Sequence, residues 1–251
     1  MAIVEWKKDG TVAIMTMNNG ENRNDPAWAQ AMLSVYNEIE ADEEIKALVL
    51  TSSDPKNFCL GADLIWVTEQ MKAGDFDAIS KWLYGNNKVF RALMMAPFPT
   101  IAAITGHAFG NGAMLAGCCD FRFMRADRGY MCFPEIDTGI QMAPSMLEWM
   151  STIIPDHLFK RMLLTGDKIT AKELEENHVI IKACEDAEKT VEEAVAFART
   201  FNKSRAAMRE MKARAYKHII DKMEKDDPEY FDNKPERAQQ GQIPVFMITL
   251  G

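Results

Sequence analysis

One stretch decides the fold of this chain: Gly106-His107-Ala108-Phe109-Gly110-Asn111-Gly112-Ala113-Met114. It follows an apolar, strand-like run over 99–105 and leads into Leu115-Ala116-Gly117-Cys118-Cys119, which predicts the start of a buried helix. Glycines at such a junction leave backbone N–H groups uncovered at the helix N-terminus, where partial positive charge favours an anion. The alternative is a tight strand-to-helix turn whose glycines only supply unusual dihedral angles.

A second segment has the same design. Asn57-Phe58-Cys59-Leu60-Gly61-Ala62-Asp63-Leu64 also follows a strand candidate, over 47–52, and also turns at a glycine into a predicted helix. Two such junctions can each aim one amide at the same small atom, as an oxyanion hole requires. One well-placed donor stabilises a transition state by roughly 3 kcal/mol.

With these two segments the chain resembles the crotonase family, the enoyl-CoA hydratase and isomerase superfamily. Cys119-Asp120 and Phe133-Pro134-Glu135-Ile136 follow in the expected order, and the resemblance covers about residues 3–225. It implies an α/β fold, a crotonase-type spiral of ββα units over 1–185 that holds a CoA-thioester site. An α-helical C-terminal region and tail, 186–251, would help to build a homotrimer or a dimer of trimers. Coenzyme A would belong to the substrate, so no separate cofactor is expected.

The resemblance assigns three catalytic groups. The backbone N–H groups of Ala62 and Asn111 would be the oxyanion donors, and Glu135 the acid. Asn111 stands where hydratases typically have glycine, so its side chain would crowd the thioester although the amide donor remains. Hydratases also use a glutamate on the helix after the glycine turn. This chain has Met114 there, and a thioether can neither activate nor orient a water.

The resemblance also implies which residues surround the substrate. Contacts to coenzyme A are expected from six residues: Asn24, Leu60, Gly61, Ala62, Asp63 and Gly110. An acyl pocket is expected from three others: Met114, Phe133 and Ile140. Arg23 or Lys56 can meet a phosphate, although solvated surface charge explains both equally well. Asp63 is expected to cap its junction rather than to act in the chemistry.

One carboxylate with an oxyanion hole suits a proton shuttle. Glu135 would remove the α-proton of a 3-enoyl thioester and return it at the γ-carbon, which gives the conjugated 2-enoyl thioester. Its apolar neighbours should raise the pKa of Glu135 and exclude water. The run Arg125-Ala126-Asp127-Arg128-Gly129-Tyr130 also resembles single-glutamate Δ3,Δ2-enoyl-CoA isomerases. The sequence therefore predicts an enoyl-CoA isomerase, and fatty acid β-oxidation is the setting that the resemblance implies.

Other functions stay open at this point. An enoyl-CoA hydratase would need Glu148 or another acid to replace what Met114 lacks. A thioester hydrolase or decarboxylase on the same fold is possible, because fold does not fix the reaction. A non-catalytic acyl-CoA binder is the alternative of another class, and Asn111 supports it. The spacing of Gly106–Gly112 is not the dinucleotide fingerprint, and no G-x-S-x-G elbow occurs.

Composition limits the partners. The 251 residues carry a formal net charge of −8, which disfavours binding to nucleic acid or to an anionic membrane. No stretch reaches the roughly 18 apolar residues of a membrane span, and the N-terminus does not look like a signal peptide. Five cysteines without a C-x-x-C pair favour reduced, buried thiols in a cytoplasmic protein. The four histidines lack metal-ligand spacing, so no metal is expected.

Hydrophobic periodicity, together with residues typical of turns and helix caps, predicts the remaining helices and strands. A β-hairpin over 3–7 and 12–17 and a helix from Pro26 open the chain, and further helices are predicted over 64–71, 88–95, 145–154 and 156–164. Residues 74–84 are expected to form a mobile or helical excursion. A capping box at Thr170 precedes a strand over 179–182, and 187–224 is predicted to be helical throughout. Asp120 and Arg122 are expected to pair, and His107 to form structural hydrogen bonds. The tail, 226–251, would wrap a neighbouring subunit or be partly disordered.

Overall fold

The computed structural model describes residues 2–232, and its first element is an antiparallel hairpin. Strands β1 (Val4–Asp9) and β2 (Val12–Met17) meet at Gly10, whose positive φ of 61° suits the turn. Helix α1 (Pro26–Ala41) follows, with Asp25 as its N-cap accepting a hydrogen bond from the Trp28 N–H. The predicted hairpin and helix are confirmed.

A six-stranded sheet forms the centre of the molecule, in the order β1-β2-β4-β7-β9-β11. Apart from the hairpin, every neighbouring pair is parallel. Four strands complete it: β4 (Ala47–Ser52), β7 (Thr100–Ile104), β9 (Phe121–Arg125) and β11 (Lys182–Cys184). Strands β4 and β7 are buried at every residue, as expected of a parallel sheet covered on both faces.

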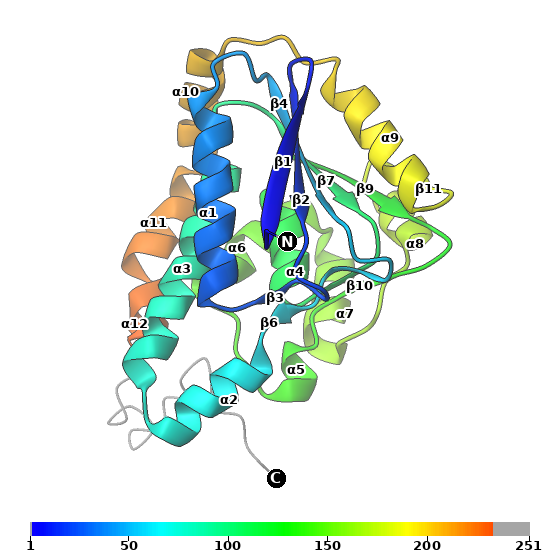
Figure 1. Ribbon diagram of the computed structural model, residues 1–251. Coiled ribbons are helices and arrows are strands. Elements are labelled where there is room, and N and C mark those ends of the chain that lie inside the picture. The colour runs from blue at the N-terminus through cyan, green and yellow to red at the C-terminus, as the bar shows by residue number, and fades with distance from the viewer. Residues whose placement is uncertain (1, 233–251) are drawn as a thin grey trace.

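The two faces of this sheet enter separate cores. Alternate side chains such as Val49 and Ile101 pack with helix α9 (Ala187–Ala198), while Leu50 and Ala102 join the larger core on the other face. Figure 1 shows α9 on one side of the sheet and α1 on the opposite side. The near-continuous apolar runs in the sequence are therefore explained by burial on both faces.

Smaller sheets carry the glycine junctions. A three-stranded parallel sheet has the order β10-β8-β5, formed by Met131–Cys132, His107–Phe109 and Asn57–Cys59. A two-stranded sheet pairs β3 (Arg23–Asn24) with β6 (Gly61–Ala62). Each of β4, β7 and β9 is thus followed by a strand of a small sheet and then a helix. This repeated ββα unit is the spiral that the resemblance implies.

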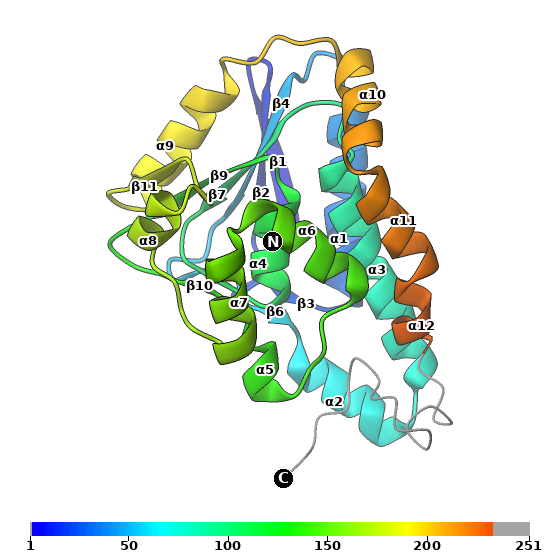
Figure 2. The same cartoon turned by 180° about the vertical axis from the view of Figure 1, so that it is seen from behind.

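The helices surround the larger core. Those that follow the junctions are α2 (Leu64–Ala73), α3 (Phe76–Met94), α4 (Asn111–Cys118) and α5 (Glu135–Thr138). Next come α6 (Pro144–Ile153), α7 (Asp156–Thr165) and α8 (Ala171–Glu176). The last helices are α10 (Arg205–Ala215), α11 (Lys217–Lys225) and α12 (Asp227–Phe231), which run beside α3 and α6 (Figure 2). None of the helices within residues 2–232 is long and apolar enough to cross a membrane.

Three predicted boundaries are wrong. The helical alternative for 74–84 and the helix over 88–95 are confirmed, but the predicted break between them is wrong, because both belong to one continuous helix, α3, capped by Asp75. Its Gly85 lies beside Ala29 of α1 and does not interrupt the helix. The strand predicted over 179–182 begins only at Lys182, because the Val179 N–H donates to the Leu174 carbonyl at the end of α8. The helical run over 187–224 breaks at 199–204, where Phe201 stacks on the sheet.

The predicted pairing of Asp120 with Arg122 is also wrong. Asp120 pairs with Lys212 of α10 at 2.6 Å, and both side chains are largely buried. Arg122 instead donates to the backbone carbonyl oxygens of Cys119 and Val179, at 2.6 and 2.8 Å. Asp120 and Arg122 therefore anchor different segments, and the C-terminal helices are fixed to the core by a buried ion pair.

Two further local predictions are corrected. His107 forms no side-chain hydrogen bond at its buried Nδ1; its ring stacks with Tyr130 instead. The capping box at Thr170 is half formed, because Thr170 accepts from the Glu173 N–H while the Glu173 carboxylate pairs with Arg161. All five cysteines are free and buried. Of the predicted tail, 226–251, residues Asp227–Phe231 form helix α12, and the part beyond 232 lies outside the described residues.

Candidate active site

The first glycine junction packs directly against the second. Gly61 has a φ of 77°, and a Cβ on it would lie 2.6 Å from the Phe109 carbonyl oxygen and 2.8 Å from the Asn111 nitrogen. Only glycine permits this approach. Asp63 then caps α2 by accepting hydrogen bonds from the Ile65 and Trp66 N–H groups, as predicted.

The amide of Ala62 faces away from the neighbouring strand. Its successor Asp63 donates its N–H to the Asn24 carbonyl on β3, at 3.1 Å. Successive amides of an extended strand point in opposite directions, so the Ala62 N–H is turned from β3 toward the other side. Ala62 itself lines a pocket on that side. It can therefore present a backbone donor to a bound molecule.

The second junction supplies a free helix N-terminus. Gly110, with φ 54° and ψ −122°, is the N-cap of α4 and provides no side-chain cap. The first amide bonded within this helix is that of Met114, which donates to the Gly110 carbonyl at 3.0 Å. The N–H groups of Asn111, Gly112 and Ala113 therefore have no partner inside the helix. This end of α4 favours negative charge.

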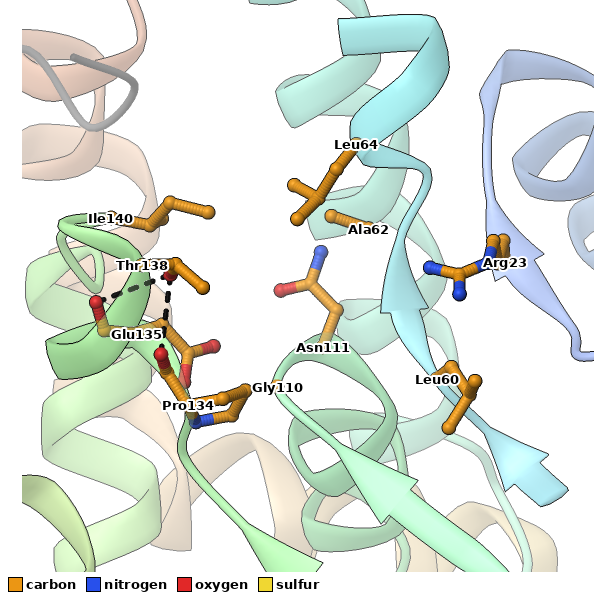
Figure 3. A pocket seen from close by; sticks show the side chains of 10 residues that line it. All are labelled: Arg23, Leu60, Ala62, Leu64, Gly110, Asn111, Pro134, Glu135, Thr138 and Ile140. Carbon is orange, nitrogen blue, oxygen red and sulfur yellow. Dashed lines mark hydrogen bonds between the residues drawn. The ribbon is translucent and has the colours of Figure 1, made fainter. Parts of the chain in front are cut away.

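Glu135 approaches the same helix end from the opposite wall. It opens α5 after Pro134, and its Oε1 lies only 2.9 Å from the position that a Cβ on Gly110 would take. Its Oε2 is buried and has no hydrogen-bond partner. Burial raises the pKa of Glu135 to about 7, in the direction predicted from its apolar neighbours. Figure 3 shows the carboxyl group turned toward Gly110.

These groups line one pocket (Figure 3). Its wall is formed by Arg23, Leu60, Ala62, Leu64, Gly110, Asn111, Pro134, Glu135, Thr138 and Ile140. Within the described residues Glu135 is the only acid on this wall. Thr138 was not anticipated; it follows Glu135 by one helical turn, which is the spacing that could have revealed it. Leu64, the first residue of α2, was missed as a wall residue as well.

Not every predicted site residue reaches the wall. Met114 and Phe133 are fully buried in the larger core and do not line the pocket, whereas Ile140 does. Three predicted residues lie behind the wall and support it: Asn24, Gly61 and Asp63. The Asn24 carbonyl oxygen accepts hydrogen bonds from the Asp63 N–H and, at 2.8 Å, from the Trp82 indole N–H.

The charged candidates lie farther out. Arg23 reaches the rim, where its guanidinium pairs with Glu21 at 2.9 Å. Lys56 is exposed and does not line the pocket. Glu148 lies on α6, 3.7 Å from Lys222 and outside the pocket, so the structure does not place a second acid there. Over residues 2–232 no group of three potential metal ligands comes together.

Comparison with known proteins agrees with this architecture. A family model described as enoyl-CoA hydratase/isomerase matches residues 7–234. The chain is 30% identical over 188 residues to the peroxisomal enoyl-CoA delta isomerase 2 of Arabidopsis thaliana, covering 74% of this chain and 78% of that protein. It is equally 30% identical to a short-chain-enoyl-CoA hydratase of Clostridium acetobutylicum, over 72% of this chain and 69% of the relative.

Solved structures show the same fold. An enoyl-CoA hydratase/isomerase family protein from Pseudomonas syringae superposes with a TM-score of 0.83 at 21% identity, covering 92% of this chain and 97% of the other. The chain belongs to the enoyl-CoA hydratase/isomerase family, and its fold is the crotonase fold. Both isomerases and hydratases occur among relatives of equal identity, so the choice between them rests on the pocket.

Proposed function

We propose that this chain is an enoyl-CoA isomerase that moves the double bond of a 3-enoyl-CoA to the 2-position. The supporting observation is the single carboxyl group, Glu135, on the pocket wall of the described chain. Addition of water to an enoyl thioester is served in this family by two carboxylates around one water. Here the second position is Met114, which is buried in the core.

The proposed reaction is a proton shuttle by one group. The Glu135 carboxylate removes a proton from C2 of the substrate, and the electron pair moves onto the thioester oxygen to give a dienolate. The N–H groups of Ala62 and Asn111 hold that oxygen by hydrogen bonds. Glu135 then delivers the same proton to C4 as the carbonyl re-forms, which leaves the double bond between C2 and C3. No atom or electron is gained or lost.

The environment of Glu135 suits this task. A carboxyl pKa of about 7 makes Glu135 a stronger base than an ordinary glutamate, and about half of it is ionised at neutral pH. The unpartnered Oε2 is free to accept the proton. Leu60, Leu64 and Ile140 make the remaining wall largely apolar, which keeps water from adding to the conjugated product.

The substrate class, the pathway, the cellular location and the assembly of the enzyme are also part of the proposal. Acyl-CoA thioesters are the proposed substrates, with Arg23 at the rim available to a phosphate. Similarity to the fatty acid oxidation complex subunit alpha of Vibrio campbellii, of which this chain spans 24%, supports a role in fatty acid oxidation. We further propose a cytoplasmic homotrimer or dimer of trimers, built through the region after residue 185. Sedimentation of the purified protein tests the assembly.

Two substrates measured side by side test the reaction. Isomerisation of 3-hexenoyl-CoA raises the ultraviolet absorbance of the conjugated thioester, whereas hydration of 2-hexenoyl-CoA lowers it. We expect the first reaction to dominate, and Glu135→Gln to lose about 10²–10⁴-fold in rate while still binding the thioester. Glu148→Gln is the matched control and should retain the rate. Efficient hydration by the wild type would overturn the assignment, and binding without either reaction would favour a non-catalytic acyl-CoA binder.

A further inference from the structure

Asn111 places an uncommitted carboxamide inside the pocket. Figure 3 shows this side chain rising from the start of α4 into the space between Ala62 and Leu64 on one side and Thr138 and Ile140 on the other. Within residues 2–232 no hydrogen bond involves the Asn111 side chain. Its donor and acceptor atoms are therefore available to whatever fills the pocket.

The other polar groups on the wall already have partners or a task. The Thr138 hydroxyl lies 3.2 Å from the carbonyl oxygens of both Pro134 and Glu135. The Arg23 guanidinium pairs with Glu21 at the rim. Glu135 is the proposed proton carrier. Asn111 is thus the group on the wall whose hydrogen-bonding capacity is left for the acyl part of the substrate.

Filling the pocket changes the surroundings of this carboxamide. In the free protein Asn111 is partly exposed, and water can satisfy its NH₂ and C=O groups. An acyl chain that passes over it displaces this water. A plain alkyl chain then leaves a polar group covered without a partner, which is unfavourable, whereas an oxygen on the chain restores a hydrogen bond. Sites that present a polar group discriminate strongly against ligands that cannot pair with it.

We propose that Asn111 is a specificity-determining residue that favours acyl groups carrying a hydroxyl or oxo oxygen over alkyl chains of the same size. This rests on the proposed function in one respect, that the acyl-CoA thioester binds with its carbonyl at the Ala62 and Asn111 amides. The carboxamide both donates and accepts, so a hydroxyl and an oxo group are both suitable partners. The backbone amide of Asn111 serves the thioester, and its side chain serves the acyl group.

Equilibrium binding of unreactive, saturated thioesters tests this selection separately from catalysis. Calorimetry would compare 4-, 5- and 6-hydroxyhexanoyl-CoA, each with the thioester in which a methyl group replaces the hydroxyl, and 5-oxohexanoyl-CoA with 5-methylhexanoyl-CoA. We expect at least one oxygen-bearing thioester to bind the wild type about tenfold more tightly than its methyl partner. The response to the oxo compound separates the donor from the acceptor function of the carboxamide.

Variants assign the preference to Asn111. Asn111→Ala should abolish the preference, and Asn111→Leu, similar in size but apolar, should reverse it. Thr138→Val removes the side-chain hydroxyl on the pocket wall and should keep the preference. Equal binding of all paired thioesters by the wild type would overturn the proposal, as would a preference that survives in both Asn111 variants. If the preference is found but 3-enoyl-CoA is not isomerised, only the proposed reaction fails.

Discussion

Replacing Glu135 by glutamine should stabilise the protein at alkaline pH while it abolishes the proposed activity. The substitution keeps the shape of the side chain and removes its ionisation. Burial raises the pKa of Glu135 from 4.5 to about 7 in the folded protein. A difference of about 2.5 units, at about 1.4 kcal/mol per unit, corresponds to roughly 3 kcal/mol.

The sign of this effect on the free energy of unfolding depends on whether the folded or the unfolded chain releases the Glu135 proton at the lower pH. Below about pH 4.5 Glu135 is protonated in both the folded and the unfolded chain, so its ionisation does not affect stability. As the pH rises toward 7, the unfolded chain releases this proton and the folded protein does not, which lowers the free energy of unfolding. Above about pH 7 both states are ionised and the loss is complete. The advantage of Glu135→Gln therefore grows with pH to a plateau.

Urea unfolding at pH 5, 7 and 8.5 measures this advantage. Relative to its value at pH 5, the stability difference between Glu135→Gln and wild type should grow by about 2–3 kcal/mol at pH 8.5. Glu69→Gln, on an exposed position of α2, is the matched control and should show little change with pH. A difference that stays constant within about 0.5 kcal/mol would show that Glu135 is not held in a desolvating site.

Two further substitutions test the framework. Gly110→Ala places a Cβ 2.9 Å from the Glu135 Oε1 at a positive φ, so unfolding experiments should show a loss of about 1–3 kcal/mol, with a fall in kcat of about 10². Gly10→Ala, at positive φ in open space, is the control and should lose stability without losing activity. If Gly110→Ala and Gly10→Ala lowered kcat equally, contact with Glu135 would not explain the loss of activity. Lys212→Met leaves Asp120 buried without its ion-pair partner and should lower the free energy of unfolding by about 3–5 kcal/mol. A loss below about 1 kcal/mol would show that the pair does not anchor α10.

Local signals predicted the parts of the site that are local in structure. The glycines at 61 and 110 and the capping Asp63 mark strand–turn–helix junctions whose geometry depends on a few neighbouring residues. Both junctions were therefore predictable from the residues, whereas the ββα repetition was implied by the family resemblance. The direction of the Glu135 pKa shift was also predicted correctly, and its cause in the structure is burial of the carboxyl group.

Features decided by distant contacts were not predictable in the same way. Asp120 forms an ion pair with Lys212, which lies 92 positions farther along the chain, and no local sequence pattern indicates this partner. Helix α3 continues through Gly85, where it packs beside Ala29 of α1, a contact between residues 56 positions apart. Met114 and Ile140 are both apolar in the sequence, yet packing places the first in the core and the second on the pocket wall. Whether an apolar residue faces the core or the pocket is decided by tertiary packing, which the local sequence does not reveal.

The proposed donor and the proposed acid are both positioned by Gly110. Gly110 begins the helix whose free amides face the pocket, and its missing Cβ is what admits the Glu135 carboxyl beside them. A second acid at Met114 would have to ionise inside a close-packed core, where an unpaired carboxylate is strongly disfavoured. A change from one-carboxylate to two-carboxylate chemistry would therefore require the wall behind Gly110 to be rebuilt, and not only a single substitution. The packing of α4 therefore supports the proposal of proton transfer rather than water addition.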